Sequence, residues 1–282
     1  MKFRSAFLLA FFCTLSVPLF AQERPFYFVM LTDPQFGMYA ANKDLARETA
    51  NYEFVVATIN RLKPAFVMVL GDMVNKTGDA EQIREFKRIT GKIDSSIPVY
   101  YVPGNHDVDH QPTPETLAAY RQNFGKDYYS FRAGPIYGIV LDTTLMVEPQ
   151  KAEAENAAQI SWLKEELEKA KGSDAKHVVI FQHHPFFIKD PQEPPQYFTI
   201  PLERRQPILA LLHQYNIRYV FAGHTHQSSV AKDGDLEMTV TGPVSMPFGE
   251  DGSGIRLAEV TPAGIRHRYF TFGKMPDGLV IK

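Results

Sequence analysis

The chain has 282 residues, of which 44% are hydrophobic and 22% are charged, so it can bury a sizeable core and is unlike a disordered protein. Its net charge is −2, and no run of Lys and Arg is longer than a pair. This balance argues against a protein that binds nucleic acid through a basic surface.

The first residues have the layout of a secretory signal peptide. Lys2 and Arg4 precede an apolar stretch over 6–20, and the small residue Ala21 comes before a polar segment. We expect cleavage after Ala21, export to the periplasm or the medium, and no stable membrane insertion afterwards. The alternative is an uncleaved anchor, although the stretch is shorter than the ~20 residues that span a bilayer. Residues 22–282 are expected to form a single domain.

Cleavage would also remove Cys13, the only cysteine, and would lower the net charge to −4 because residues 1–21 hold two basic residues and no acidic one. A mature chain without a thiol excludes disulfides, cysteine zinc sites and a cysteine nucleophile. Any metal must therefore be held by imidazole, carboxylate and amide groups.

The rest of the chain alternates between apolar runs and amphipathic stretches. In the helix expected at 152–171 the apolar positions recur every three or four residues, and Gly172 is placed to end it: Ala157, Ile160, Leu163, Leu167 and Ala170. In chain order the pattern predicts strand 26–31, helix 45–62, strand 65–70, helix 80–92, strand 99–102, helix 113–123, strand 136–141, helix 152–171, strand 177–181, helix 207–215, and strands 218–222, 236–241, 255–260 and 265–271.

This alternation favours an α/β architecture in which helices cover a largely parallel sheet. The strand-rich end of the chain suggests a second sheet. The Pro-rich segment 186–200 is expected to be an ordered loop, and the segments 185–201 and 242–254 would form the rim of a site. On these rims Tyr197, Phe198, Phe248 and Arg256 could contact a substrate, or they could only pack.

Five of the predicted strands end in polar clusters. The carboxyl ends of strands in an open α/β sheet are where sites are built, and five such clusters in succession are hard to attribute to ordinary loop polarity. The clusters are Asp33-Pro34-Gln35, Gly71-Asp72, Gly104-Asn105-His106-Asp107, His183-His184 and Gly223-His224-Thr225-His226.

The residue types in these clusters indicate a metal site. Aspartate, glutamine, asparagine and histidine offer only oxygen and imidazole nitrogen, a set that suits Mn, Fe, Zn or Ni. Asp72 is central enough in the order to bridge two cations. Glycines at 71, 104 and 223 would let the backbone turn sharply beside the ligands.

These clusters, with Gly-Asn-His-Asp and Gly-His-x-His as the most specific, resemble the five motifs of calcineurin-like metallophosphoesterases. Within that superfamily the chain is most similar to the calcineurin-like phosphoesterase domain-containing protein group, a Ser/Thr phosphatase-like group. The shared features include Asp-Pro-Gln-Phe-Gly at 33–37 and the tail from Gly254 to Tyr269. The resemblance implies a four-layer sandwich, with two mixed β-sheets flanked by helices.

The resemblance also implies roles for residues. One metal would be bound by Asp33, Gln35, Asp72 and His226, and a second by Asp72, Asn105, His183 and His224, with Mn, Fe or Zn as the ions. His106 would face the leaving-group oxygen. Beyond the resemblance, we expect Asp107, the next residue in the sequence, to orient His106. The common motif has His at position 35, so Gln35 implies a looser first metal or a harder ion. Gln35 could also be a plain loop amide.

The predicted function is metal-dependent hydrolysis of phosphate esters, with a phosphomonoester on a small molecule or a phosphoprotein as substrate. The alternatives are a phosphodiesterase acting on cyclic nucleotides or lipid headgroups, and a non-catalytic metal- or phosphate-binding module. His184 is expected beside the ligands or facing the substrate. Asn75, Asp109 and His110 are either functional or mere loop polarity, and Asp142 is expected to be structural.

Overall fold

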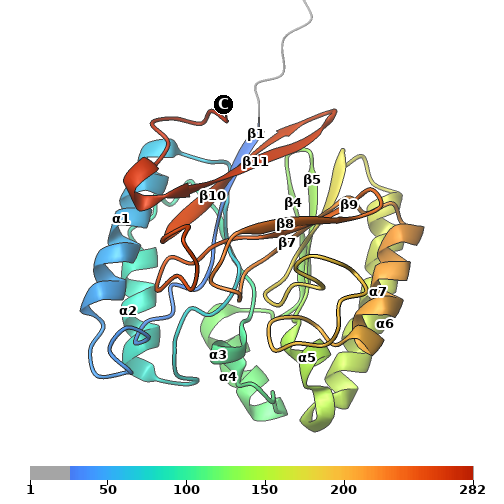
Figure 1. Cartoon of the computed structure of the whole chain (residues 1–282), viewed down its shortest axis with the longest axis horizontal. Helices are drawn as coiled ribbons and strands as arrows, with labels where there is room; N and C mark the ends of the chain where they lie inside the picture. Colours follow the sequence, from blue (N-terminus) through green and yellow to red (C-terminus); the bar gives the residue numbers. More distant parts are fainter. Residues whose placement is uncertain (1–25, 282) are drawn as a thin grey trace, which may run out of the picture.

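The computed structural model describes residues 26–281, so the proposed signal peptide at 1–21 lies outside the described residues. Two mixed β-sheets lie face to face, and helices cover the outer side of each (Figure 1). This arrangement confirms the predicted four-layer sandwich. Among the described residues, no helix combines the length and the apolar character that a membrane crossing requires.

The first sheet has the strand order β11-β10-β1-β2-β3. Its three N-terminal strands run parallel, whereas β10 pairs antiparallel with β1 and β11 antiparallel with β10. The strands are β1 Phe26–Leu31, β2 Val67–Val69, β3 Val99–Tyr101, β10 Gly254–Thr261 and β11 Gly264–Thr271.

The second sheet has the order β4-β5-β6-β7-β9-β8, with four parallel strands in the middle and an antiparallel strand at each edge. The sequence pattern missed both edge strands, in which every residue is half-buried or exposed. The strands are β4 Tyr129–Ala133, β5 Ile136–Val140, β6 His177–Phe181, β7 Tyr219–Ala222, β8 Ser229–Asp233 and β9 Leu236–Val240.

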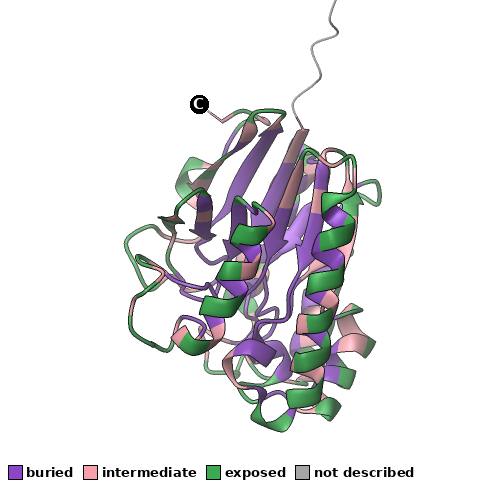
Figure 2. Ribbon diagram, turned by 90° about the vertical axis from the view of Figure 1, so that its right-hand side faces the viewer, coloured by how far each residue is buried: buried purple, intermediate pink, exposed green. Residues whose placement is uncertain are grey.

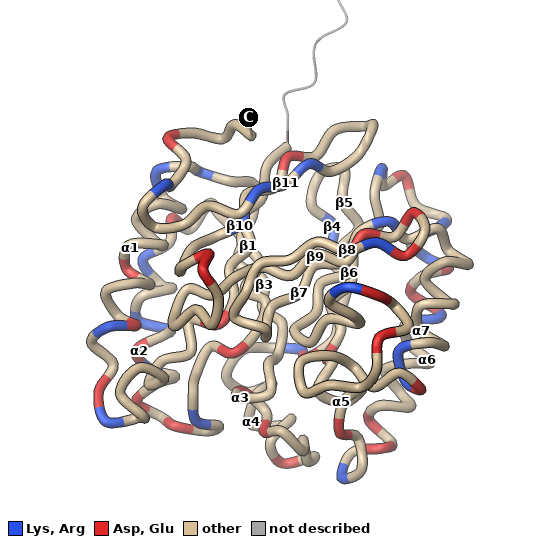
Figure 3. The backbone as a smooth tube through the Cα atoms, in the orientation of Figure 1, with Lys and Arg blue, Asp and Glu red and all other residues tan. Residues whose placement is uncertain are grey.

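The long helices form the two outer layers. In Figure 1, α1 and α2 cover the first sheet, and α6 and α7 cover the second. Figure 3 shows Lys and Arg interspersed with Asp and Glu along these helices. The helices are α1 Ala46–Leu62, α2 Ala80–Thr90, α3 Asn105–Val108, α4 Pro114–Phe124, α5 Thr144–Val147, α6 Glu153–Lys171 and α7 Leu202–Gln214, with 3₁₀ turns at η1 Pro149–Lys151 and η2 Phe272–Lys274.

Strand alternation distributes the apolar side chains between the layers. In β1, Phe28 and Met30 point between the sheets, whereas Val29 and Leu31 pack under α1 and α2. The central strands of the two sheets are therefore mostly buried, as the purple strands in Figure 2 show. Phe28 stacks on Phe66 in the inner layer, with ring centroids 4.7 Å apart. Each such fully buried side chain contributes about 1.5–3 kcal/mol, and this rigid layer fixes the strand ends on which the polar loops are carried.

Helix α7 begins at Leu202, five residues before the predicted start, and includes Pro207 in its interior. The reason lies in Arg205, which is fully buried and donates to the carbonyls of Pro191, Glu193 and Ile200. These bonds tie the Pro-rich loop to the first turn of the helix. Hydrogen bonds between a side chain and a distant backbone leave no periodic signal in a sequence.

Helix α6 shows a second difference from the predicted face. Ala157 is exposed, and Gln159 is fully buried in its place. The Gln159 amide both accepts from the Asp142 backbone N–H and donates to the Asp142 carbonyl, which fixes the end of β5. The buried position on this helix is thus taken by a polar residue that hydrogen-bonds the backbone at the end of β5. The spacing had predicted an apolar residue on this face.

Asp142 is fully buried, and its Oδ2 has no hydrogen-bond partner among the described residues. Burial, and secondarily Asp127, raise the pKa of Asp142 to about 7. Because the folded pKa lies above the unfolded value, stability falls as the pH rises from about 4 to 7. We expect Asp142→Asn to remove this dependence and to stabilise the protein at pH 8 by on the order of 2–4 kcal/mol. Denaturant unfolding of both proteins at pH 4.5 and 8 measures the effect. If the variant and the wild type differ in free energy of unfolding by the same amount at both pH values, the prediction is wrong.

Candidate metal centre

The loops after β1, β2, β3, β6 and β7 meet at one edge of the sandwich and carry the seven predicted ligands. All seven side chains are buried, with at most 5% of each exposed. Carboxylate, amide and imidazole groups cost free energy when buried, so a cluster of them needs compensating partners. The seven are Asp33, Gln35, Asp72, Asn105, His183, His224 and His226.

The side chains approach one another at distances that suit shared cations. His183 Nε2 lies 3.3 Å from Asp72 Oδ2, and His226 Nε2 lies 3.3 Å from Asp33 Oδ1. One ligand atom each from Asp33, Asp72 and His183 lies within 4.8 Å of the others. The structure therefore brings together residues that are up to 193 positions apart in the chain.

Five of the seven side chains hold a buried polar atom with no hydrogen-bond partner among the described residues. Burying such atoms unpaired costs about 1–3 kcal/mol each, and a charged atom costs more. Each is an atom that can ligate a metal: Asp33 Oδ1, Gln35 Oε1, Asn105 Oδ1, His183 Nε2 and His224 Nε2. The donor set and these unpartnered atoms fit a pair of divalent cations.

Hydrogen bonds on the far side of these groups fix their orientation. His183 Nδ1 donates to the Leu70 carbonyl at 2.7 Å, and His226 Nδ1 donates to the Met246 carbonyl at 2.6 Å. A proton on Nδ1 leaves the lone pair on Nε2 of the neutral ring, which is the form that binds a metal. Gln35 is oriented similarly, because its Nε2 donates to Asn75 Oδ1 at 3.3 Å and so leaves Oε1 free.

The backbone at the ligands is in an unusual conformation. Five of the seven have positive φ, a region that non-glycine residues rarely adopt: Asp33 at 50°, Gln35 at 39°, Asp72 at 52°, His224 at 71° and His226 at 54°. Such residues cost of order 1–3 kcal/mol each and cluster at functional sites. The fold therefore maintains strain where the ligand set is assembled.

Two of the glycines predicted to matter are required by close approach. A Cβ at Gly104 would overlap the Asp72 carboxylate, and a Cβ at Gly223 would overlap the Thr32 hydroxyl. Neither has a positive φ. A side chain is therefore excluded at both positions because there is no room for it beside the neighbouring loop. A sharp turn, which the sequence suggested, is not the reason.

Charges inside the cluster are strongly coupled. Burial lowers the pKa of His183, but the adjacent Asp72 carboxylate outweighs it and raises this pKa to about 9, so a metal that binds Nε2 would replace a proton there. Burial and His183 together lower the pKa of His224 to about 3, which leaves His224 a neutral imidazole. The carboxylates stay ionised, because His226 lowers the pKa of Asp33 and His183 lowers that of Asp72 against the opposing effect of burial.

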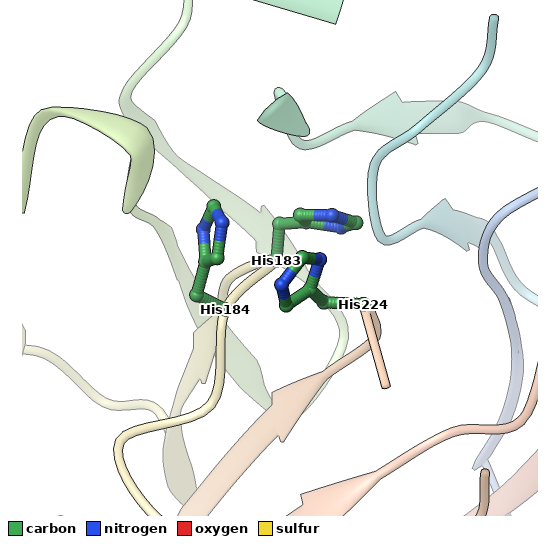
Figure 4. Close-up of side chains that lie close together, drawn as sticks. All are labelled: His183, His184 and His224. Atoms are coloured by element: carbon green, nitrogen blue, oxygen red, sulfur yellow. The ribbon is translucent and has the colours of Figure 1, made fainter. Parts of the chain in front are cut away.

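His184 lies beside this group, as Figure 4 shows. One of its ring nitrogens falls within 4.8 Å of a ring nitrogen of His183 and of His224. Its Nδ1 is 3.0 Å from the Thr143 hydroxyl, and burial, followed by His224, lowers the pKa of His184 well below its ordinary value. It is therefore a neutral, anchored imidazole at the edge of the ligand cluster.

The surroundings of His106 differ from the expected arrangement. Asp107 does not hold the His106 ring; its carboxylate accepts from the backbone N–H groups of Met73, Val74 and Gly104. The His106 Nδ1 instead donates to the Asn75 carbonyl at 2.7 Å. Asp107 thus fixes the loops after β2 and β3 to each other, and Asn75, whose role the sequence left open, contacts both His106 and Gln35.

Aromatic side chains form the rim of the cluster. Tyr197 and Phe198 approach His224, with ring centroids 5.3 and 5.7 Å away, and Phe248 stacks on His226 at 4.4 Å. Arg256 turns away into the fold, where it donates to Thr241, Ser228 and the Val240 carbonyl. The sequence did not decide whether these residues contact a substrate or only pack within the protein. Arg256 packs within the protein.

A cavity of about 410 Å³ opens beside the ligands. It is bounded on one side by Asn105, His184 and His224, and on the other by α5 and the Pro-rich loop. Its size suits a small organic group next to the metal cluster.

Residues 26–228 match the model of the calcineurin-like phosphoesterase family. The serine/threonine-protein phosphatase CPPED1 of Rattus norvegicus is 33% identical over 266 residues, which cover 89% of this chain and 85% of the relative. Two solved structures share the fold. GAP50, the anchor in the inner membrane complex of Plasmodium, has a TM-score of 0.66 at 16% identity and covers 89% of this chain and 86% of its own. A dimetal phosphatase from Danio rerio has a TM-score of 0.60 at 15% identity, and the match covers 86% of this chain and 99% of that structure's chain.

These similarities confirm the resemblance read from the five motifs and the predicted phosphoric ester hydrolase. The chain belongs to the calcineurin-like phosphoesterase family of metal-dependent hydrolases.

Proposed function

We propose that the protein is a phosphomonoesterase with a dinuclear metal centre of Mn, Fe or Zn. The observation that carries this is the convergence of five buried ligand atoms without a hydrogen-bond partner. The named activity of the CPPED1 relative, a serine/threonine-protein phosphatase, supports a phosphoprotein or a small phosphate monoester as the substrate.

The ligands would divide into two sets that share Asp72. Asp33, Gln35 and His226 would complete the first set, in which Asp33 Oδ1 lies 3.3 Å from His226 Nε2. Asn105, His183 and His224 would complete the second. Gln35 is neutral where the common motif has His, and amide oxygen binds hard ions better than soft ones, which favours Mn or Fe over Zn in the first set.

A metal pair supplies positive charge to the phosphoryl oxygens and makes the attacking water more acidic. The protein supplies positioning. His106 has its Nδ1 bound to the Asn75 carbonyl, so Nε2 is the nitrogen that can protonate the departing oxygen or stabilise its charge. Asp107 acts through the backbone by holding the loop that carries Asn105 and His106.

The test combines metal analysis with matched substrates. We expect two metal ions per chain and higher kcat/KM on p-nitrophenyl phosphate than on bis-p-nitrophenyl phosphate. A higher rate on the diester would instead assign the phosphodiesterase alternative, and a metal-loaded protein with no turnover on either would overturn the proposal.

We also propose that the protein is exported, because residues 1–21 have the charge and apolar pattern of a signal peptide. Fractionation of the producing cells, followed by N-terminal sequencing, should find a mature chain that begins at Gln22 outside the cytoplasm. An intact Met1 in the cytoplasm would refute export, and an intact Met1 in the membrane fraction would support an uncleaved anchor.

A further inference from the structure

The cavity beside the metal ligands is lined by one formally charged side chain, Glu148, and by neither Lys nor Arg. Glu148 directly follows α5 and is half-buried. Among the described residues its carboxylate forms no hydrogen bond and no ion pair. A partly buried carboxylate without a partner is poorly compensated, and a cation that enters the cavity would compensate it.

Three histidines also line the cavity, namely His110, His184 and His224. Among the described residues, none of the three forms an ion pair with the Glu148 carboxylate, and the His184 ring is anchored to the Thr143 hydroxyl. The Pro-rich loop contributes carboxylates elsewhere, but Glu193 is already engaged by the backbone N–H groups of Ile188 and Lys189. The one Asp, Glu, Lys or Arg side chain of the lining is therefore an unpaired carboxylate, next to the site where a phosphate dianion would bind.

The remaining walls suit an aliphatic stem that ends in a cation. Val147, Pro195 and Pro201 provide apolar surface. Tyr197, whose side chain is largely exposed, offers a ring face to which a cation is attracted. A phosphate placed at the metal ligands would direct its alcohol portion into this space, because Asn105 and His224 belong to both the ligand set and the cavity wall.

We propose that this cavity binds the alcohol portion of the substrate and selects phosphomonoesters whose alcohol portion carries a positive charge near the phosphate. This inference rests on the proposed phosphomonoesterase function. Two sources share this chemistry: a phosphoserine followed by Lys or Arg, and the phosphate ester of an amino alcohol. Anionic alcohol portions are disfavoured by repulsion from Glu148.

The test measures kcat/KM of the metal-loaded protein on three phosphoserine peptides that differ only in the next residue, Lys, Gln or Glu. Phosphoethanolamine and glycerol phosphate form a second pair without a peptide. We expect the Lys peptide to exceed the Gln peptide about fivefold at low salt, and the gap to shrink as ionic strength rises. In Glu148→Gln the ratio of kcat/KM on the Lys peptide to kcat/KM on the Gln peptide should fall to about one.

Glu165→Gln, which neutralises an exposed carboxylate on α6, is the matched control and should keep the preference. A preference confined to the peptides assigns a phosphoprotein source, and one confined to phosphoethanolamine assigns a small amino-alcohol ester. Equal rates across both sets, or a preference that survives in Glu148→Gln, would refute the inference and leave the phosphomonoesterase standing. Absence of turnover on every monoester, including p-nitrophenyl phosphate, would overturn both.

Discussion

Asp72→Asn is expected to abolish binding of the metal pair and to lower turnover on phosphate monoesters by about 1,000-fold or more. Asp72 is the ligand that the two proposed sets share, and its two oxygens face different partners. Oδ1 accepts from the His106 backbone N–H at 2.9 Å, and Oδ2 faces His183 at 3.3 Å. An amide lacks the negative charge that a bridge between two cations needs.

The substitution changes little else, which makes it informative. Asn has nearly the same shape as Asp and tolerates a positive φ comparably well, so the 52° at this position is retained. The folded protein should therefore survive. Metal content per chain, measured by elemental analysis after dialysis, and kcat on p-nitrophenyl phosphate provide the two primary measurements.

Thermal stability gives a readout that does not depend on activity. Ions that bind only the folded state raise its stability, so a chelator should lower the Tm of the wild-type protein and leave that of Asp72→Asn almost unchanged. Asp174→Asn, at a carboxylate that is 94% exposed, should behave like the wild type. Two metal ions or wild-type turnover in Asp72→Asn would refute the shared-ligand assignment.

The sequence predicted that these side chains converge, because the information that brings them together is local and repeated. Each ligand follows an apolar run that had to be a buried strand, and parallel strands bring their carboxyl ends to one edge. Gly104 and Gly223 were also recognisable from the sequence, because each stands next to a ligand in its motif. A side chain at either position would overlap the loop beside it. Local pattern plus sheet topology therefore sufficed to bring the five clusters together, whereas the assignment of ligands within them came from the family resemblance.

The groups that support the ligands could not be derived in this way. Asn75 contacts Gln35 across 40 positions of the chain, and Asp107 binds backbone N–H groups 33 and 34 positions away. These contacts depend on the relative position of two loops, which no periodicity encodes. Proximity in sequence favoured Asp107 as the partner of His106, but the loop geometry directs the carboxylate toward the backbone.

Glu148 shows a further limit of sequence reasoning. It lies in no motif, follows a four-residue helix that the pattern did not reveal, and becomes relevant only because the Pro-rich loop closes the opposite wall. Arg205 holds that loop through three carbonyls. The ligand cluster is thus encoded by short motifs, whereas the shape and charge of the adjoining cavity arise from tertiary packing.

His106→Ala is expected to keep both metal ions and to lower kcat on alkyl phosphates by about 100- to 1,000-fold. The metal ligands should be preserved because the contact between residue 106 and Asp72 is made by the backbone N–H, which alanine retains. The lost group is the ring whose Nδ1 is held by the Asn75 carbonyl and whose Nε2 is available to the leaving oxygen.

The leaving group distinguishes this role from a structural one. An alkoxide leaves poorly without a proton, whereas p-nitrophenolate leaves readily, so the loss should be large on an alkyl phosphate and small on p-nitrophenyl phosphate. His213→Ala, which removes a partly exposed imidazole paired with Asp233, is the matched control and should leave both rates unchanged. An equal loss on both substrates, or a lower metal content in His106→Ala, would show that His106 maintains the site and does not act on the leaving group.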